Sequence, residues 1–139
     1  GGGMPLSACV AKPDYMAAWT MEGGEAIHTA TFLGHPVSAA AGLASLEVLQ
    51  EMDAPREARR IERICRARFG ERIRGRGAML GFETGSPGEG ARMAGELLKR
   101  GWITLPGGVH GDILGITPPL VITDEQLEAA LDAIADVAN

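Results

Sequence analysis

The chain has 139 residues, enough for one domain with a single hydrophobic core or for part of a larger protein. Its 45% hydrophobic and 22% charged residues are ordinary globular values and exclude a disordered or collagen-like chain. The net charge of −5 argues against a general polyanion binder.

The first 52 residues contain one short apolar run and one long helical pattern. Residues 6–11 are apolar and are followed by Lys-Pro-Asp, which predicts a short buried strand. Residues 15–30 are mixed and contain glycine, which predicts a loop with one helical turn at 16–19. Pro36 then opens a stripe of apolar residues that continues to about Met52, which predicts a long, alanine-rich helix.

The next segment carries most of the arginine. Nine of the eleven arginines lie between Arg56 and Arg76 beside three glutamates, so this segment has a charge of +6 and the remainder −11. Apolar residues recur in it at helical spacing, which predicts an amphipathic helix from residue 53 or 54 to just before Gly70. A nucleic-acid-binding patch is the alternative. We expect no nucleic-acid binding, because no aromatic residues alternate with the arginines to stack on bases.

The remaining residues alternate between strand and helix patterns. Residues 73–84 predict a strand entered through a Gly-flanked turn, and residues 89–100 predict a helix. Residues 102–105 and 112–117 predict two short strands, and Thr123 with Gln126 forms a capping-box pattern that opens a last helix. This order indicates a small α/β sandwich whose sheet carries helices on one face. Asp53-Ala54-Pro55 stops one helix and starts the next, so we place a domain boundary between residues 52 and 53.

Several common functional signals are missing from the sequence. No run of about 18 uncharged apolar residues occurs, so we expect no transmembrane helix and no membrane partner, and the first eight residues do not resemble a signal peptide. Cys9 and Cys65 cannot build a disulfide framework and lie in no metal-binding motif. We therefore expect a cytoplasmic protein without a bound metal.

Glycine and histidine patterns give little catalytic signal. The glycines of residues 75–81 resemble a dinucleotide fingerprint, but the last glycine lies one residue too far along and the segment precedes a strand. His28, His35 and His110 lie near no serine or cysteine nucleophile in a recognisable pattern. These features name no catalytic residue.

One segment does have the chemistry of an anion site. Residues 29–36, Thr-Ala-Thr-Phe-Leu-Gly-His-Pro, place a hydroxyl and free backbone amides directly before a helix. This combination is suited to holding a phosphate group. The alternative is that Thr31 caps the helix or fills a turn.

Four segments, in order along the whole chain, resemble class III pyridoxal-phosphate aminotransferases, the fold-type-I group that contains acetylornithine, ornithine and 4-aminobutyrate aminotransferases. They are Gly-Gly-Gly-Met-Pro-Leu (1–6), Thr-Phe-Leu-Gly-His-Pro (31–36), Arg-Gly-Arg-Gly-Ala-Met-Leu-Gly (74–81) and Pro-Pro-Leu-Val-Ile-Thr (118–123). Any one of these matches is weak, but four in the family's order are strong.

The resemblance implies a fold, an activity and one site residue. The fold is the C-terminal segment of a fold-type-I pyridoxal-phosphate transferase: residues 1–52 would be a strand and long helix ending the large cofactor-binding domain, and 53–139 the small C-terminal α/β domain. The activity is transfer of an amino group between an amino acid or amine and a 2-oxo acid, with pyridoxal 5'-phosphate as cofactor, in a homodimer. Thr31 would reach across the dimer interface and bind the phosphate of the partner subunit's cofactor.

The sequence departs from the family pattern at two places. The family's Schiff-base lysine lies a few residues before the glycine turn, and neither Lys12 nor Lys99 matches it, so we expect this chain alone to be inactive. Family members commonly have a carboxylate-binding arginine three residues before the double proline. Here that position is Gly115, which leaves the substrate class open. The rival interpretation is a non-catalytic α/β module, derived from an aminotransferase, that binds a partner through its alanine-rich helix.

Overall fold

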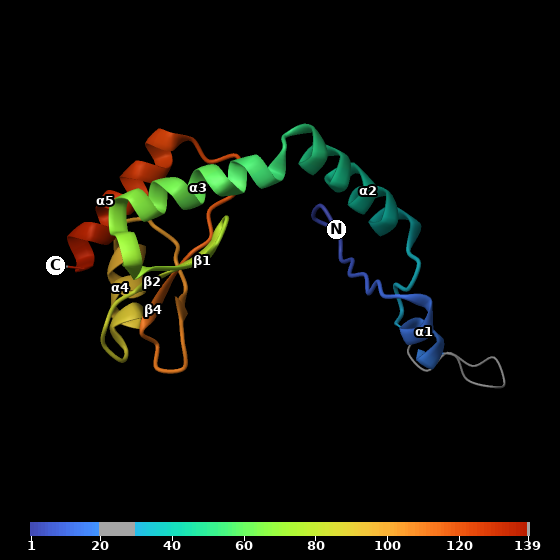
Figure 1. Cartoon of the computed structure of the whole chain (residues 1–139), viewed down its shortest axis with the longest axis horizontal. Coiled ribbons are helices and arrows are strands. Elements are labelled where there is room, and N and C mark those ends of the chain that lie inside the picture. The colour runs from blue at the N-terminus through green and yellow to red at the C-terminus, as the bar shows by residue number, and fades with distance from the viewer. Residues whose placement is uncertain (20–29, 139) are drawn as a thin grey trace. The chain divides into compact units, whose positions relative to one another are not determined.

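The computed structural model describes residues 1–19 and 30–138, which form two compact units, Gly1–Met52 and Asp53–Asn139 (Figure 1). Most of the loop predicted over 15–30, with His28, lies outside the described residues. None of the helices in the described ranges is long and apolar enough to cross a membrane. The assignment of residues 1–52 to a larger cofactor-binding domain stays a prediction.

The first unit is built on one long helix. α2 (Pro36–Glu51) confirms the predicted helix, and the short helices α1 (Pro13–Met16) and η1 (Ala17–Trp19) precede the undescribed segment. The strand predicted over residues 6–11 is wrong: these residues form no strand, and Val10 is 91% exposed. A strand needs a hydrogen-bonded partner, and the described part of this unit contains none for it.

The glycine turn at the N-terminus packs closely on α2. The Met4 N–H donates to the Gly1 carbonyl at 3.0 Å, and Gly2 adopts a φ of 58°. A Cβ atom built on Gly2 would lie 2.9 Å from the Ala41 carbonyl oxygen, so a side chain there would be strained both by its conformation and by its neighbour.

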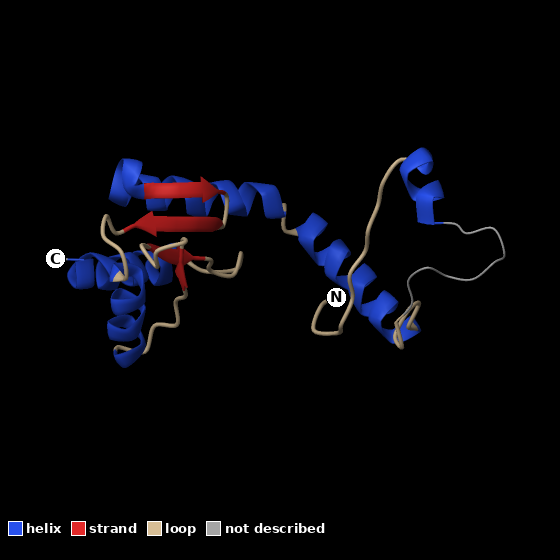
Figure 2. Cartoon of the chain, turned by 90° about the horizontal axis from the view of Figure 1, so that it is seen from below, coloured by secondary structure: helices blue, strands red, loops and turns tan. Residues whose placement is uncertain are grey.

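The second unit is a four-stranded antiparallel sheet with helices (Figure 2). Its elements are α3 (Ala54–Phe69), η2 (Gly70–Arg72), β1 (Ile73–Arg76), β2 (Met79–Glu83), α4 (Glu89–Lys99), β3 (Pro106–Gly107), β4 (Ile113–Ile116) and α5 (Asp124–Ala138). The strand order is β1-β2-β4-β3. The predicted α/β class is therefore confirmed, and the three helices of this unit lie where the sequence predicted them.

Two strand predictions in this unit need correction. Residues 73–84 form a hairpin, in which Ile73 lies opposite Phe82, instead of a single strand. The chain reverses between β1 and β2 at Gly77, whose φ is 62°. Residues 102–105 form no strand, and pairing with β4 begins only at Pro106.

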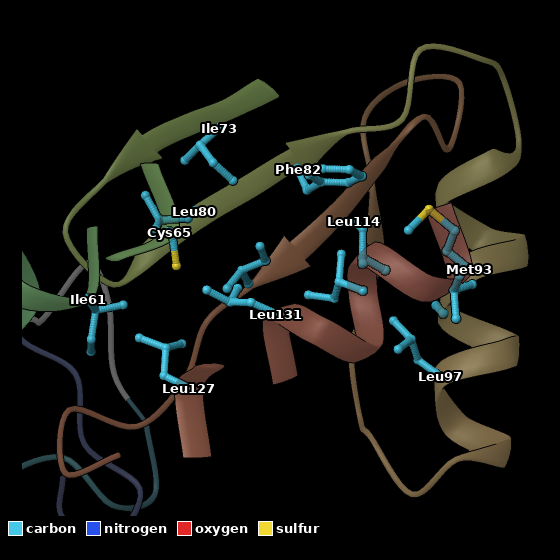
Figure 3. Close-up of a cluster of buried hydrophobic side chains, with 14 residues drawn as sticks. Ile61, Cys65, Ile73, Leu80, Phe82, Met93, Leu97, Leu114, Leu127 and Leu131 are labelled. Atoms are coloured by element: carbon cyan, nitrogen blue, oxygen red, sulfur yellow. The ribbon is translucent and has the colours of Figure 1, made fainter. Parts of the chain in front are cut away.

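The core of this unit lies between the sheet and its helices (Figure 3). Phe82 of β2 and Leu114 of β4 are fully buried, and they share one cluster with Leu97 of α4 and Leu131 of α5. Cys65 of α3 belongs to the same cluster, and burial raises the pKa of its thiol to about 11.

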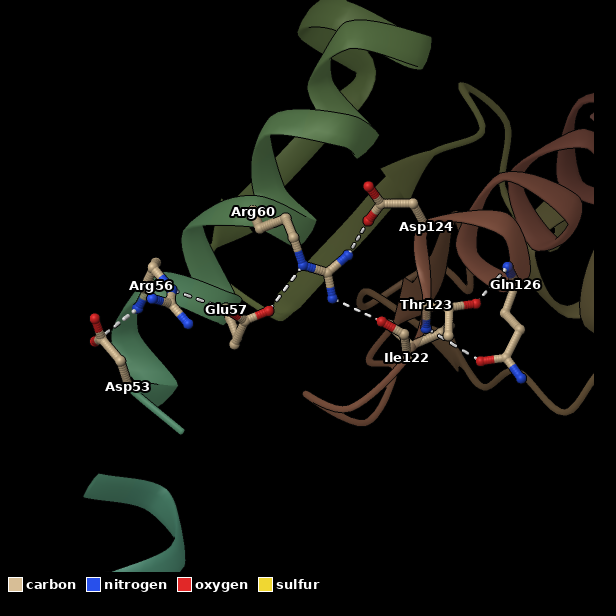
Figure 4. Close-up of polar contacts among 8 residues, drawn as sticks. All are labelled: Asp53, Arg56, Glu57, Arg60, Ile122, Thr123, Asp124 and Gln126. Atoms are coloured by element: carbon tan, nitrogen blue, oxygen red, sulfur yellow. Dashed lines mark hydrogen bonds and ion pairs between the residues drawn. The ribbon is translucent and has the colours of Figure 1, made fainter. Parts of the chain in front are cut away.

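The starts of α3 and α5 follow the cap signals in the sequence (Figure 4). The Arg56 N–H donates to Asp53 Oδ1 at 3.3 Å. The Gln126 N–H donates to Thr123 Oγ1 at 3.2 Å, and Gln126 Oε1 accepts from the Thr123 N–H at 3.1 Å. The predicted capping box is therefore confirmed.

Side chains of α3 cover the outer edge of β1. Arg66 Nη1 donates to the Ile73 carbonyl at 2.8 Å, and Arg66 Nη2 donates to the Gly75 carbonyl at 2.9 Å. Glu62 Oε1 pairs with Arg66 Nε at 2.9 Å, and Glu62 Oε2 accepts from the Gly77 N–H at 2.7 Å. The hairpin is thus tied to α3 by charge-assisted hydrogen bonds.

Candidate functional site

Thr31 lies in a double turn that leads into α2. The Leu33 N–H donates to the Ala30 carbonyl at 3.0 Å, and the His35 N–H donates to the Phe32 carbonyl at 3.1 Å. Gly34 has a φ of 69°, a conformation that L side chains rarely adopt. The two turns place Thr31 on the surface, just before the start of the helix.

The helix cap is provided by His35. Its Nδ1 accepts the Ser38 N–H at 3.3 Å and lies 3.1 Å from Ser38 Oγ, and Ser38 is only 3% exposed. The ring of Phe32 meets the His35 ring edge-on at a centroid distance of 5.6 Å. Sequence reasoning missed this cap, although a hydrogen-bond acceptor directly before a proline at the first helical position was a usable signal.

The Thr31 hydroxyl is consequently not used to cap α2. It forms no hydrogen bond with any residue in the ranges 1–19 and 30–138, and the residue is exposed. Phe32 and Leu33 beside it are 65% and 69% exposed, an apolar surface unusual for a turn. A hydroxyl with a free donor on an ordered turn fits the phosphate of a cofactor, which accepts hydrogen bonds.

Gly115 lies in the other unit, in the middle of β4. Its N–H donates to the Leu105 carbonyl at 2.8 Å, and a Cβ atom built on Gly115 would lie 3.0 Å from that same oxygen. A larger residue at this position therefore requires the 105 segment to give way by a few tenths of an ångström.

A pocket of about 240 Å³ opens beside Gly115. Its walls are mainly apolar and include Trp102, Pro118, Pro119 and Leu131. Thr104 also lines it, and the buried Oγ1 of Thr104 has no hydrogen-bond partner among the described residues. The lining contains no charged side chain, so the pocket alone offers no ion-pair partner to a carboxylate.

Five of the nine arginines in the arginine-rich segment form ion pairs with acidic side chains of the described residues. Arg60 lies between Glu57 and Asp124 and also donates to the Ile122 carbonyl at 2.6 Å, so it joins α3 to the segment before α5 (Figure 4). Hydrogen bonds from Arg60, and then from Arg56, hold the pKa of Glu57 below its usual value. Ion pairs also engage other arginines of this segment: Arg66 with Glu62, Arg68 with Asp132, and Arg74 with Glu83.

Metal-ligating side chains do not gather in the described part of the chain. Within residues 1–19 and 30–138, no three His, Cys, Asp or Glu side chains are grouped so that they could hold a metal ion.

Comparison with known proteins identifies the family. The chain matches the family model described as Aminotransferase class-III over residues 1–138. It is 37% identical over 142 residues to an acetylornithine aminotransferase of Corynebacterium efficiens, covering 99% of this chain and 33% of that protein. It is also 32% identical over 156 residues to a leucine/methionine racemase of Thermococcus litoralis, covering 99% of this chain and 34% of that protein.

A solved structure agrees with this match. The acetylornithine aminotransferase of Elizabethkingia anophelis aligns with a TM-score of 0.72 at 25% identity, over 84% of this chain and 33% of that one. The chain thus spans about a third of the length of the curated relatives it matches. Because the family model covers nearly every residue, the chain belongs to the class III aminotransferase family.

Proposed function

We propose that this chain works as part of a pyridoxal-phosphate-dependent aminotransferase that moves an amino group between an amino acid or amine and a 2-oxo acid. The observation that carries the proposal is the match to the family over residues 1–138. One relative is named as a leucine/methionine racemase, which is a different reaction on amino acids, and no feature of the described residues favours that reaction.

Thr31 is the residue that we assign to the cofactor. Its hydroxyl is exposed and unused by the helix cap, and it would donate a hydrogen bond to a phosphate oxygen of the cofactor bound by the partner subunit of a homodimer. The exposed apolar side chains of Phe32 and Leu33 support an interface here, because contact with a second subunit would remove them from water. When bound, pyridoxal phosphate supplies the electron-withdrawing ring that amino-group transfer requires.

Gly115 limits how a substrate carboxylate can be recognised. A glycine has no side chain with which to grip a carboxylate, and the pocket beside it is apolar. We propose that recognition of any substrate carboxylate rests on residues other than position 115.

The activity is tested on the protein that contains this chain, purified with pyridoxal phosphate. Amino-group transfer is followed by mass spectrometry, with panels of isotope-labelled amino acids and amines as donors and 2-oxo acids as acceptors. Transfer to at least one acceptor is expected. Its absence across the panels would contradict the proposed activity.

The role of Thr31 is tested by the rate and extent of cofactor loss on dialysis. A hydroxyl-to-phosphate hydrogen bond with a charged acceptor contributes roughly 1.5–3 kcal/mol, so Thr31→Ala should weaken cofactor retention by about ten- to a hundredfold. Thr31→Ser keeps the hydroxyl and is the matched control, which should retain the cofactor.

A mixed dimer separates action across the interface from action within a subunit. One subunit carries Thr31→Ala, and the other lacks the cofactor lysine. If Thr31 acts across the interface, the lysine-bearing subunit receives an intact threonine from its partner and keeps its cofactor. If the mixed dimer loses cofactor as fast as the Thr31→Ala homodimer, the interface role is wrong, whatever the reaction.

A further inference from the structure

A hollow on the surface of α3 is lined almost entirely by arginine. Its volume is about 390 Å³, and its walls are Arg56, Glu57, Arg59, Arg60 and Arg63. Residues three and four apart share one side of a helix, so the four arginines form a single basic surface. We call this feature the α3 hollow.

Two of these arginines already have partners. Glu57 accepts from Arg56 Nε at 3.1 Å and from Arg60 Nε at 2.9 Å, and Arg60 also pairs with Asp124 (Figure 4). Arg59 and Arg63 differ, because neither forms an ion pair or hydrogen bond with any residue in the described ranges 1–19 and 30–138. The α3 hollow therefore keeps about two positive charges without a neutralising group.

This arrangement opposes helix stability. Like charges four residues apart on a helix, such as Arg59 and Arg63, repel each other. Elsewhere on α3, acidic side chains pair with the arginines and reduce this repulsion, as Glu62 does with Arg66 and Asp132 with Arg68. At Arg59 and Arg63 the repulsion is left in place beside an open hollow, where an anion would relieve it.

We propose that the α3 hollow binds a phosphate group, through the guanidinium groups of Arg59 and Arg63. A phosphate monoester carries nearly two negative charges at neutral pH, which matches the two unpaired arginines. Each guanidinium presents parallel N–H donors that fit two phosphate oxygens. Glu57 and its two partners, Arg56 and Arg60, form the rest of the lining.

The site is tested by titrating the whole chain, labelled with nitrogen-15, at low ionic strength. Inorganic phosphate and phosphoserine are added in separate experiments, and the arginine Nε–Hε signals are followed. Saturable shifts at Arg59 and Arg63 are expected. Equal affinity for both probes would identify the phosphate group itself as the ligand, and tighter binding of phosphoserine would identify a phosphate ester.

Variants with matched charge separate a site from a general effect of net charge. Arg59→Gln and Arg63→Gln should each weaken phosphate binding up to about fivefold, and the double variant up to about 25-fold, as expected for exposed ion pairs. Arg68→Gln and Arg100→Gln remove the same charge outside the hollow and should leave the affinity unchanged. Unshifted signals elsewhere in each spectrum verify that the variants are folded.

Three results would overturn the proposal. They are the absence of saturation, an equal loss of affinity in the Arg68 and Arg100 controls, and shifts spread evenly over all the arginines. Binding of duplex DNA without binding of either small phosphate would assign the surface to a nucleic acid instead. The logarithm of the DNA-binding constant would then fall linearly with the logarithm of the salt concentration, with a slope proportional to the number of phosphates contacted.

Discussion

Replacing glycine by alanine should have opposite effects on the free energy of unfolding at two positions of α4. A Cβ atom at Gly90 would lie 2.3 Å from the Ile113 carbonyl oxygen and 2.8 Å from the Gly111 carbonyl oxygen. Both neighbours are backbone, and the Gly90 N–H also donates to Gly111 at 2.9 Å. At Gly95 no described heavy atom lies within 4 Å of the corresponding position.

The magnitudes follow from these surroundings. Gly95→Ala should raise the free energy of unfolding by about 0.5–1 kcal/mol, because alanine loses less backbone entropy in a helix. Gly90→Ala should lower it by about 2–4 kcal/mol, because overpacking and a displaced hydrogen bond outweigh that gain. The close approach of α4 to β4 at Gly90 thus decides whether alanine raises or lowers the free energy of unfolding.

Urea unfolding measures both variants. Trp102 packs against the core of the second unit, so its fluorescence reports on that unit in a Trp19→Phe background. With a slope near 1 kcal/mol per molar urea, the midpoints of the two variants should differ by about 2.5–5 M. Equal stability of Gly90→Ala and the parent, or destabilisation by Gly95→Ala, would refute the reasoning.

The remaining predictions concern thiol reactivity and pH. Cys9 is exposed, whereas Cys65 is buried with its thiol pKa raised to about 11, so iodoacetamide at about pH 8 should label Cys9 alone in the native chain, as peptide mass spectrometry would show. Labelling of native Cys65 would contradict its burial. Hydrogen bonds from Gly77 and Arg66 lower the pKa of Glu62, so this carboxylate stabilises the fold above about pH 4.3 and its contribution is lost as pH falls through its lowered pKa. Glu62→Gln should therefore be less stable than the parent at neutral pH, by urea unfolding, and a gap that stayed constant into acid would count against this assignment.

The helices were predictable because each carries a local signal. The capping residues Asp53 and Thr123 mark helix starts, and those hydrogen bonds form within four residues of sequence. The strands were harder, because a strand depends on a partner that lies elsewhere in the chain. Residues 6–11 have the apolar pattern of a buried strand but find no partner in the described part of their unit.

The candidate site shows the same division between local and distant information. The phosphate-binding hypothesis for Thr31 came from its own segment, and the turn that exposes its hydroxyl is equally local. The bridging role of Arg60 joins α3 to Ile122 and Asp124, more than sixty residues away, and composition gives no sign of it. Nor did sequence distinguish Arg59 and Arg63 from their paired neighbours, since that difference depends on which acids the fold brings near.

The cover over β1 has a consequence for solubility. An uncovered edge strand offers free carbonyl groups to any extended chain, and proteins aggregate when edge strands of different molecules pair through such hydrogen bonds. Here the Arg66 guanidinium already occupies the outward oxygens of Ile73 and Gly75. An incoming strand would have to break those bonds and separate Arg66 from Glu62 before gaining any of its own. The Arg66 side chain thereby opposes pairing of β1 with a strand of a neighbouring molecule.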